Sequence, residues 1–329
     1  MQALAKTGPT ALATLIDRRF RLPAHLLLID EVLVEGVWRA RERRRDRPEI
    51  ILVTAPPRHG KSTVTSLYYP AWFLGTFPER RVILASYEAD FAATWGQKTR
   101  QLLEDHGPSL YGVRVDDSSR AASRWDLHRH PGGMVTAGVG GPIIGRGAHL
   151  LVIDDPLKNA EQAASPTIRE KQWEWWLSTA RTRLEPGAVV VIVMTRWHEA
   201  DLAGRLLGGS RDGGDPVTEI RLPALAERND RLGRDAGEAL WPERFNRDYL
   251  EHTREVQGPY WFSAIYQGRP TPDEGGIFDR KDFRYFEIDG DYVVLRQPDR
   301  SKKKFAPGLC RKFQVVDLAA SEKETADTR

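Results

Sequence analysis

The amino-acid sequence predicts an α/β fold with a mostly parallel sheet flanked by helices. Short runs rich in β-branched residues alternate with segments of helical spacing along most of the chain. One such run, EIILVT, leads into the loop APPRHGKST, and another ends in the acidic pair of LLVIDDP. This alternation favours parallel pairing, because a crossover helix returns the chain to the edge where the previous strand began.

The individual elements follow in order along the chain. Segment 23–47 has apolar residues at helical spacing and ends in the basic run WRARERRRDR, which could contact DNA phosphates or form a solvated helix end. Strands are predicted at 49–54, 80–86, 133–139, 149–155 and 188–195, and helices at 88–103 and 168–184. The stretch 270–312 predicts a linker or small connecting region, after which FQVVDLAAS predicts a new strand.

The composition is typical of a globular protein. Of the 329 residues 40% are apolar, and the net charge is only +3, so any attraction to nucleic acid depends on local clustering. Cys310 is the single cysteine, which excludes an intramolecular disulfide and fits a reducing compartment. The longest clean apolar run, AVVVIVM, is too short for a membrane span of ~20 residues, and the N-terminus lacks the pattern of a secretion signal. We therefore expect a soluble, cytoplasmic protein.

The loop APPRHGKST, residues 55–63, has the pattern of a phosphate-binding loop with an unusual composition. It follows a strand and precedes a helix, so backbone N–H groups between Gly60 and Thr63 would surround phosphate oxygens. Lys61 is expected to reach the β- and γ-phosphates of a nucleotide, and Ser62 to bind Mg²⁺ through its hydroxyl. Most such loops carry glycine at the position of Ala55.

Two prolines and an arginine fill the first half of this loop. Pro56 and Pro57 lack N–H groups, but the donors needed most come from the Gly60 end, so the prolines can stiffen the first half at fixed φ. Arg58 places a fixed positive charge beside the nucleotide, where it could compensate for the missing glycine or sense the γ-phosphate. A surface role for Arg58 is the alternative.

The acidic pair after the strand 149–155 supplies the second half of a nucleotide site. Asp154 would bind Mg²⁺ directly or through water. Asp155 occupies the place where many related ATPases carry the glutamate that orients the attacking water, so it is the candidate catalytic carboxylate, although it is one methylene shorter. Seen alone, such a pair would also fit a helix cap.

Two further segments could contribute to this site. Glycines surround Arg146 in GVGGPIIGRGAH, which suits an arginine finger that stabilises the transferring phosphoryl group, or else a glycine-rich hairpin with an exposed arginine. Thr195 ends the strand 188–195 and could read the nucleotide state. His198 and Asp201 favour polar coupling over a metal pair, and tryptophans 173, 175 and 176, at helical spacing, favour a core role over base stacking.

Five motifs, in this order, resemble the large terminase subunit of tailed bacteriophages and prophages: PPRHGKST, GVGGPIIGRGAHLLVIDDP, SPTIREKQWEWWLSTARTRLEPG, MTRWHEADLAGRL and GEALWPERF. The resemblance covers nearly the whole chain. It implies a RecA-like (ASCE) P-loop NTPase domain over residues 1–270, a linker over 271–312, and the first strand of an RNase H-like nuclease domain over 313–329.

The resemblance also implies roles for single residues. Lys61 and Ser62 would bind ATP, Asp154 would hold Mg²⁺, Asp155 would act in catalysis, and Thr195 would belong to the coupling motif. Arg146 would complete a neighbour's site in a ring. Asp317 would be the first metal-binding aspartate of the nuclease, and because two-metal hydrolysis needs several carboxylates, we expect that domain to be truncated and inactive in this chain.

The implied partners are double-stranded DNA, the portal protein and the small terminase subunit, in a homo-oligomeric ring on the procapsid, in the host cytoplasm and without a membrane. The resulting interpretation is an ATP-hydrolysing DNA-packaging motor. Two alternatives stay open. The Ala-Pro opening of the loop also resembles helicase-like DNA-dependent ATPases, and the chain could be a docking module that binds nucleotide without turnover.

Overall fold

The computed structural model describes residues 1–42, 47–143, 145, 147–270, 286–296, 301–306 and 308. The chain divides into two compact units, Met1–Pro270 and Thr271–Arg329. In the described part of the chain, no helix is both long and apolar enough to cross a membrane.

The first unit is built around an eight-stranded sheet with the order β3-β4-β5-β2-β6-β7-β1-β8. The strands from β5 to β8 in this order are all parallel, whereas β3 and β4 add an antiparallel hairpin at one edge. This arrangement confirms the predicted mostly parallel sheet. The parallel strands are β5 (Gly133–Gly138), β2 (Arg81–Ser86), β6 (Ala148–Asp154), β7 (Leu184–Met194), β1 (Glu49–Thr54) and β8 (Val217–Arg221), and the hairpin strands are β3 (Val115–Ala121) and β4 (Arg124–Leu127).

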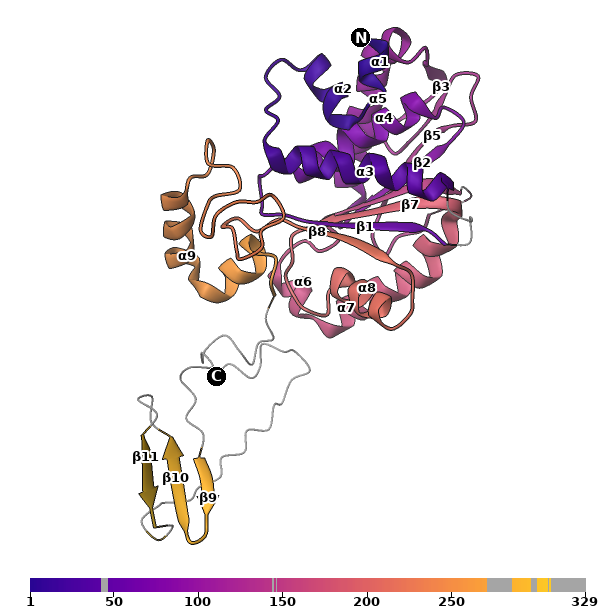
Figure 1. The fold of residues 1–329 in the computed structure, drawn as a ribbon. Coiled ribbons are helices and arrows are strands. Elements are labelled where there is room, and N and C mark those ends of the chain that lie inside the picture. The colour runs from indigo at the N-terminus through magenta and orange to yellow at the C-terminus, as the bar shows by residue number, and fades with distance from the viewer. Residues whose placement is uncertain are drawn as a thin grey trace. The chain divides into compact units, whose positions relative to one another are not determined.

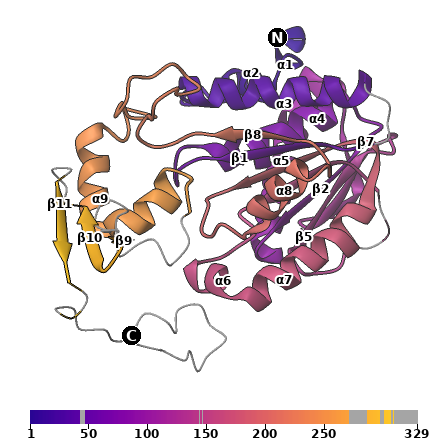
Figure 2. The same cartoon turned by 60° about the horizontal axis from the view of Figure 1, so that its bottom comes forward.

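Helices cover both faces of this sheet, because both faces of its central strands are apolar (Figures 1 and 2). In β1, Ile51 and Val53 pack into one core cluster, while Ile50 and Leu52 pack into the other. The first face carries α1 (Gln2–Ala5), α2 (Pro9–Ile16), α3 (Ala24–Glu42), the π-helical η1 (Thr63–Tyr68), α4 (Tyr69–Thr76) and α5 (Ala89–Leu110). The second face carries α7 (Pro166–Trp175), the π-helical η2 (Trp176–Ala180) and α8 (Leu202–Arg211), with α6 (Ala160–Ala164) before them and the short 3₁₀ turn η3 (Arg181–Arg183) after η2.

The parallel register brings several strand ends to one edge of the sheet. Thr54 at the end of β1 pairs with Met194 of β7, and Asp154 at the end of β6 pairs with Val193 of β7 and Ser86 of β2. The loop after β1, the acidic pair after β6 and Thr195 after β7 therefore meet at this carboxyl edge. In α/β sheets this is the edge where ligands bind.

The remainder of the first unit packs around α9 (Arg247–Trp261) and the π-helical η4 (Phe262–Tyr266). Leu250 and Phe262 join Leu225 and its neighbours in a third, smaller core cluster. Gly258 has a φ of 81° and kinks α9.

The second unit contains a three-stranded antiparallel sheet, β9 (Phe286–Asp289), β10 (Tyr292–Arg296) and β11 (Lys302–Phe305). These strands lie in the region expected to be a linker or small connecting region, where the sequence predicts no strand. The strand predicted at FQVVDLAAS, with Asp317, lies outside the described residues.

Candidate nucleotide-binding site

The loop between β1 and η1 closes over the carboxyl edge of the sheet. Arg58 and Gly60 have φ values of 64° and 84°, so both lie in the left-handed region. Glycine adopts this region without steric cost, whereas an arginine there costs conformational energy. The helix begins at Lys61, which places the first N–H groups of the helix at the mouth of the loop.

Lys61 connects the loop to the two other predicted site segments. Its side chain is 7% exposed, and its Nζ donates to Thr195 Oγ1 at 3.0 Å and lies 3.8 Å from Asp155 Oδ2. The Thr195 backbone N–H in turn donates to Asp155 Oδ1 at 2.9 Å. The structure therefore brings together three residues that are far apart in the sequence.

Ser62 and Asp154 form the second contact of the loop with the sheet edge. The Ser62 hydroxyl donates to Asp154 Oδ1 at 2.8 Å, while Asp154 Oδ2 is buried without a hydrogen-bond partner among the described residues. Burial and the neighbouring Asp155 charge raise the pKa of Asp154 above its ordinary value. A bound cation would stabilise the ionised form of this carboxylate. The hydroxyl and carboxylate oxygens are hard ligands that fit Mg²⁺, which usually completes its shell with phosphate oxygens and water.

The residues Lys61, Ser62, Asp155 and Thr195 line a cavity of about 620 Å³. Asp155 is the only carboxylate among the described residues of its wall, and Arg58 reaches it from an exposed position. Four aromatic residues complete the wall: Tyr87, Phe91, Trp95 and Trp197. Trp197 follows Thr195 at the strand end that was expected to face the ligand, whereas the first three were not predicted from the sequence. The spacing of the first three by four residues, continuing into α5, is the signal that could have found them.

A second cavity, of about 830 Å³, lies against the same loop at Gly60 and Thr63. Phe20 and Trp241 provide aromatic surface there, and Arg244 lies over the Trp241 ring at 5.3 Å. Gly60 and Thr63 line both cavities, whereas Lys61 and Ser62 line only the first. Among the described residues, the loop therefore lies between two cavities that both have charged and aromatic side chains in their walls, and only the first contains Lys61, Ser62 and Asp155.

The segment after Thr195 is fixed by a buried ion pair. Arg196 Nε donates to Asp201 Oδ2 at 2.9 Å, and Asp201 Oδ1 accepts from the Gly204 N–H at the start of α8. The His198 ring accepts from the Ala200 N–H at 2.9 Å, and the His198 backbone oxygen accepts from the Asp201 N–H at 3.2 Å. Within the described residues, no cluster of three or more His, Cys, Asp or Glu could hold a metal ion.

Arg146 lies outside the described residues, so its role stays a prediction. Its neighbours are described. Gly145 lines a cavity with Arg81 at the start of β2, and Gly147 lies against Glu185 near the start of β7. Both neighbours are thus at the amino edge of the sheet, opposite the phosphate-binding loop.

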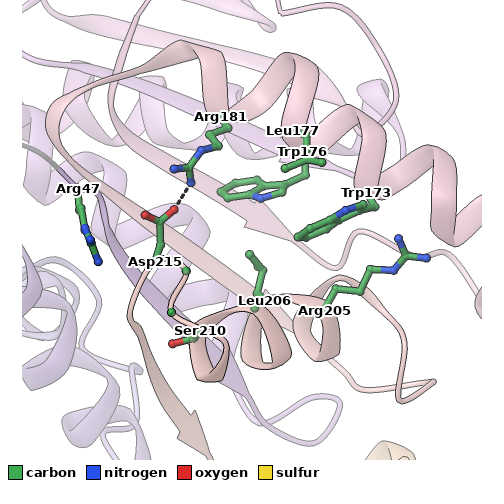
Figure 3. Close-up of a pocket in the computed structure, with 12 residues that line it drawn as sticks. Arg47, Trp173, Trp176, Leu177, Arg181, Arg205, Leu206, Ser210 and Asp215 are labelled. Atoms are coloured by element: carbon green, nitrogen blue, oxygen red, sulfur yellow. Dashed lines mark hydrogen bonds and ion pairs between the residues drawn. The ribbon is translucent and has the colours of Figure 1, made fainter.

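A further pocket, of about 460 Å³, lies between η2 and α8 and contains none of the predicted site residues (Figure 3). Trp176 and Leu206 form its apolar floor, Arg205 extends beside Trp173, and Arg181 pairs with Asp215. Trp175 and Trp176 are buried, as their helical spacing predicted, whereas Trp173 is only partly buried.

The sheet order, the loop ending in Gly60-Lys61-Ser62 and the acidic end of β6 define a P-loop NTPase domain of the RecA-like class. The chain belongs to the terminase large subunit family: residues 52–285 match the N-terminal family model of the T4likevirus-type large subunit. The predicted family is thereby confirmed, as is the predicted mostly parallel sheet flanked by helices; the strand of an RNase H-like domain stays a prediction. No curated relative matches the chain.

The solved structures that match the chain include three from large terminases of bacteriophages. The large terminase of bacteriophage HK97 is 12% identical with a TM-score of 0.47; the match covers 88% of this chain and 64% of that chain, so this chain spans less than two thirds of its length. A large terminase from a thermophilic bacteriophage, in complex with ADP, is 13% identical, with a TM-score of 0.45 and coverages of 88% and 69%. The ATPase domain of the Thermus phage P74-26 large terminase is 13% identical, with a TM-score of 0.48 and coverages of 76% and 100%.

Proposed function

We propose that this protein is the ATP-hydrolysing motor of a viral terminase that translocates double-stranded DNA into a procapsid. The observation that carries the proposal is the contact of Lys61 with both Thr195 and Asp155 at the mouth of the loop. A lysine held between a strand-end threonine and a carboxylate is placed to exchange these partners for nucleotide phosphates. The family membership of residues 52–285 supports the same function.

ATP binds with its phosphates at the loop. Lys61 contacts the β- and γ-phosphates, and N–H groups from Gly60 to Thr63 surround the phosphate oxygens. Ser62 and Asp154 would hold Mg²⁺, which would neutralise charge on the phosphates. The aromatic walls of the second cavity, Phe20 and Trp241, suit the flat nucleobase on the far side of the loop.

Hydrolysis needs a group that orients water and groups that stabilise charge on the γ-phosphate. Asp155 orients the water, since it is the only carboxylate among the described residues of this cavity wall. Arg58 supplies positive charge from the rim of the cavity. When phosphate binds, Lys61 releases Thr195. The loss of this contact couples the nucleotide state to the segment after Thr195, in which Arg196 pairs with Asp201.

Arg146 acts in a neighbouring subunit's site within a homo-oligomeric ring. The positions of Gly145 and Gly147 at the opposite edge of the sheet support action in trans over action in the same chain. We expect Arg146→Ala to bind ATP nearly normally but to lose turnover by ~10³ or more. Mixing it with Lys61→Ala should partly restore DNA-stimulated hydrolysis, because some interfaces then contain both groups. No recovery in proven mixed assemblies would make Arg58 the better candidate.

The domain boundaries belong to the same proposal: residues 1–270 form the ATPase domain, and 271–312 form a connecting region that contains the three-stranded sheet. Residues 313–329 form the start of a nuclease domain to which Asp317 would contribute metal binding. The portal protein and the small terminase subunit are the proposed partners in the host cytoplasm. Cleavage of DNA would require carboxylates beyond Asp317.

DNA-stimulated ATP hydrolysis, measured at several salt concentrations, tests the proposal. We expect duplex DNA to raise turnover, and the stimulation to fall steeply as salt rises, because phosphate contacts release counterions. A docking module without turnover predicts no phosphate release with or without DNA. A helicase-like enzyme predicts strand separation of a partial duplex, which a packaging motor does not perform.

A further inference from the structure

Two histidines hold the first half of the phosphate-binding loop. His59 in the loop is 1% exposed, and His25 in α3 is completely buried. His25 Nε2–H donates to the backbone oxygen of His59 at 2.8 Å, and His59 Nδ1–H donates to the backbone oxygen of Pro57 at 2.9 Å. A carbonyl oxygen can only accept, so each contact determines which ring nitrogen carries the proton.

Aromatic packing keeps both rings in place. The His59 ring centroid lies 4.8 Å from that of Phe245 and 5.9 Å from that of His25, and the His25 ring lies 5.5 Å from Trp241. Burial lowers the pKa of both histidines, so both rings are neutral at neutral pH. A neutral imidazole has a single N–H group, and each ring donates it to a carbonyl of the loop.

These two contacts also set the direction of two backbone N–H groups. In a trans peptide the C=O of one residue and the N–H of the next point in opposite directions. The contact at the Pro57 oxygen therefore orients the Arg58 N–H, and the contact at the His59 oxygen directs the Gly60 N–H away from α3. In the part of the chain that the structure describes, neither N–H donates a hydrogen bond, and both residues line the cavity with Lys61.

We propose that His25 and His59 are positioning residues that align the Arg58 and Gly60 N–H groups with the phosphates of the nucleotide. The inference rests on the proposed nucleotide site. It accounts for the composition of the loop: a clamp from α3 holds a glycine-poor segment whose Arg58 lies in the left-handed region. Donors that are aligned before binding stabilise a phosphate without the cost of ordering the loop.

The test compares two substitutions of His25. His25→Phe keeps an aromatic ring but lacks the Nε2–H donor, whereas the amide N–H of His25→Gln can reach a similar position. With ADP as the probe, we expect His25→Phe to raise the Kd about 10- to 100-fold, the range for losing hydrogen bonds to a charged group. His25→Gln should recover the affinity to within about threefold of the unmodified protein.

Steady-state kinetics separates positioning from a loss of folded protein. Misaligned donors weaken ground state and transition state alike, so His25→Phe should raise KM for ATP and leave kcat nearly unchanged. If the substitution only reduced the fraction of folded protein, the remaining folded molecules would have the normal KM. The apparent kcat would then fall, because fewer molecules are active. His149→Phe is the matched control, because it removes a contact of 3.3 Å between a ring nitrogen and the Arg81 N–H at the other edge of the sheet.

The ADP affinities test the positioning role of His25 separately from the nucleotide site itself. If His25→Phe does not fold, His25→Asn replaces it, because its amide is too short to reach the His59 oxygen. A folded variant without the donor that binds ADP as tightly as the unmodified protein overturns the positioning role. Failure of the unmodified protein to bind ADP refutes the nucleotide site itself, which is a different result.

Discussion

At the scale of single residues, the charge of Lys61 serves the site more than the fold. Its Nζ faces an open cavity and contacts Thr195 and Asp155, which are themselves held by other bonds. We expect Lys61→Ala to lower ATP turnover at least ~100-fold, because charge stabilisation of the transferring phosphoryl group is lost. The melting temperature should change by no more than about 3 °C. Lys98→Ala is the control, since Lys98 lies over Trp95 outside the cavity wall; unchanged turnover in Lys61→Ala would contradict the site.

His59 makes stability depend on pH in the mildly acidic range. Burial lowers its pKa from 6.5 to about 4. The unfolded chain therefore binds the proton first, and stability is lost as pH falls from about 6.5 towards about 4, by at most about 3 kcal/mol. We expect the stability advantage of the unmodified protein over His59→Asn to shrink over this range in urea unfolding. A stability difference between the two proteins that stays constant over this range would argue against the neutral, buried ring of His59.

At the scale of elements, the first turn of α8 has no room for a side chain at Gly204. A Cβ on Gly204 would lie 1.6 Å from the Glu199 backbone oxygen, whereas one on Gly208 in the same helix would meet nothing within 4 Å. Gly204→Ala should cost about 1–3 kcal/mol or more, since backbone must move beside the Arg196 and Asp201 pair. Gly208→Ala should instead stabilise by about 0.5–1 kcal/mol through helix propensity. Thermal unfolding of the two variants checks both signs, and equal effects would refute the packing argument.

The sequence predicted those strands whose residues are all buried, such as β1, but not a mostly exposed strand such as β3. The predicted strand 49–54 coincides with β1, whose residues are all buried. β3 was missed because VDDSSRA is a mostly exposed, polar edge strand without an apolar pattern. The helix predicted at 88–103 continues to Leu110 through Gly107 and Pro108, because Gly107 packs against Val113 and Leu110 is buried. Tertiary packing there outweighs weak local propensity.

At the scale of the whole molecule, every described member of the three core clusters lies in the first unit. A chain ending at Pro270 retains every member of them, including Phe262 and the Gln267 contacts with Leu225. We expect this shorter chain to unfold in one transition within about 3 °C of the full chain and to bind ADP equally well. A chain ending at Gly258 loses Phe262 and Gln267 and should be clearly less stable. A large loss of stability on ending at Pro270 would mean that the second unit supports the first.

Local patterns in the sequence determined much of this protein: the β-branched runs that form the central strands, the Gly60-Lys61-Ser62 helix start, and the acidic end of β6. These features depend on neighbours within a few residues, so composition and spacing reveal them. Thr195 was expected near the nucleotide for the same reason, because the carboxyl ends of parallel strands meet at one edge.

The tertiary structure alone decided which distant residues complete the site. His25, 34 residues before His59, donates to the loop only because α3 packs across β1, and Lys61 meets Thr195, 134 residues later, only because β7 lies between β6 and β1. The order of strands in a sheet follows from how all helices and strands bury their apolar faces together. No local pattern records that order, so the clamp on the loop and the aromatic wall of the second cavity emerged only from the fold.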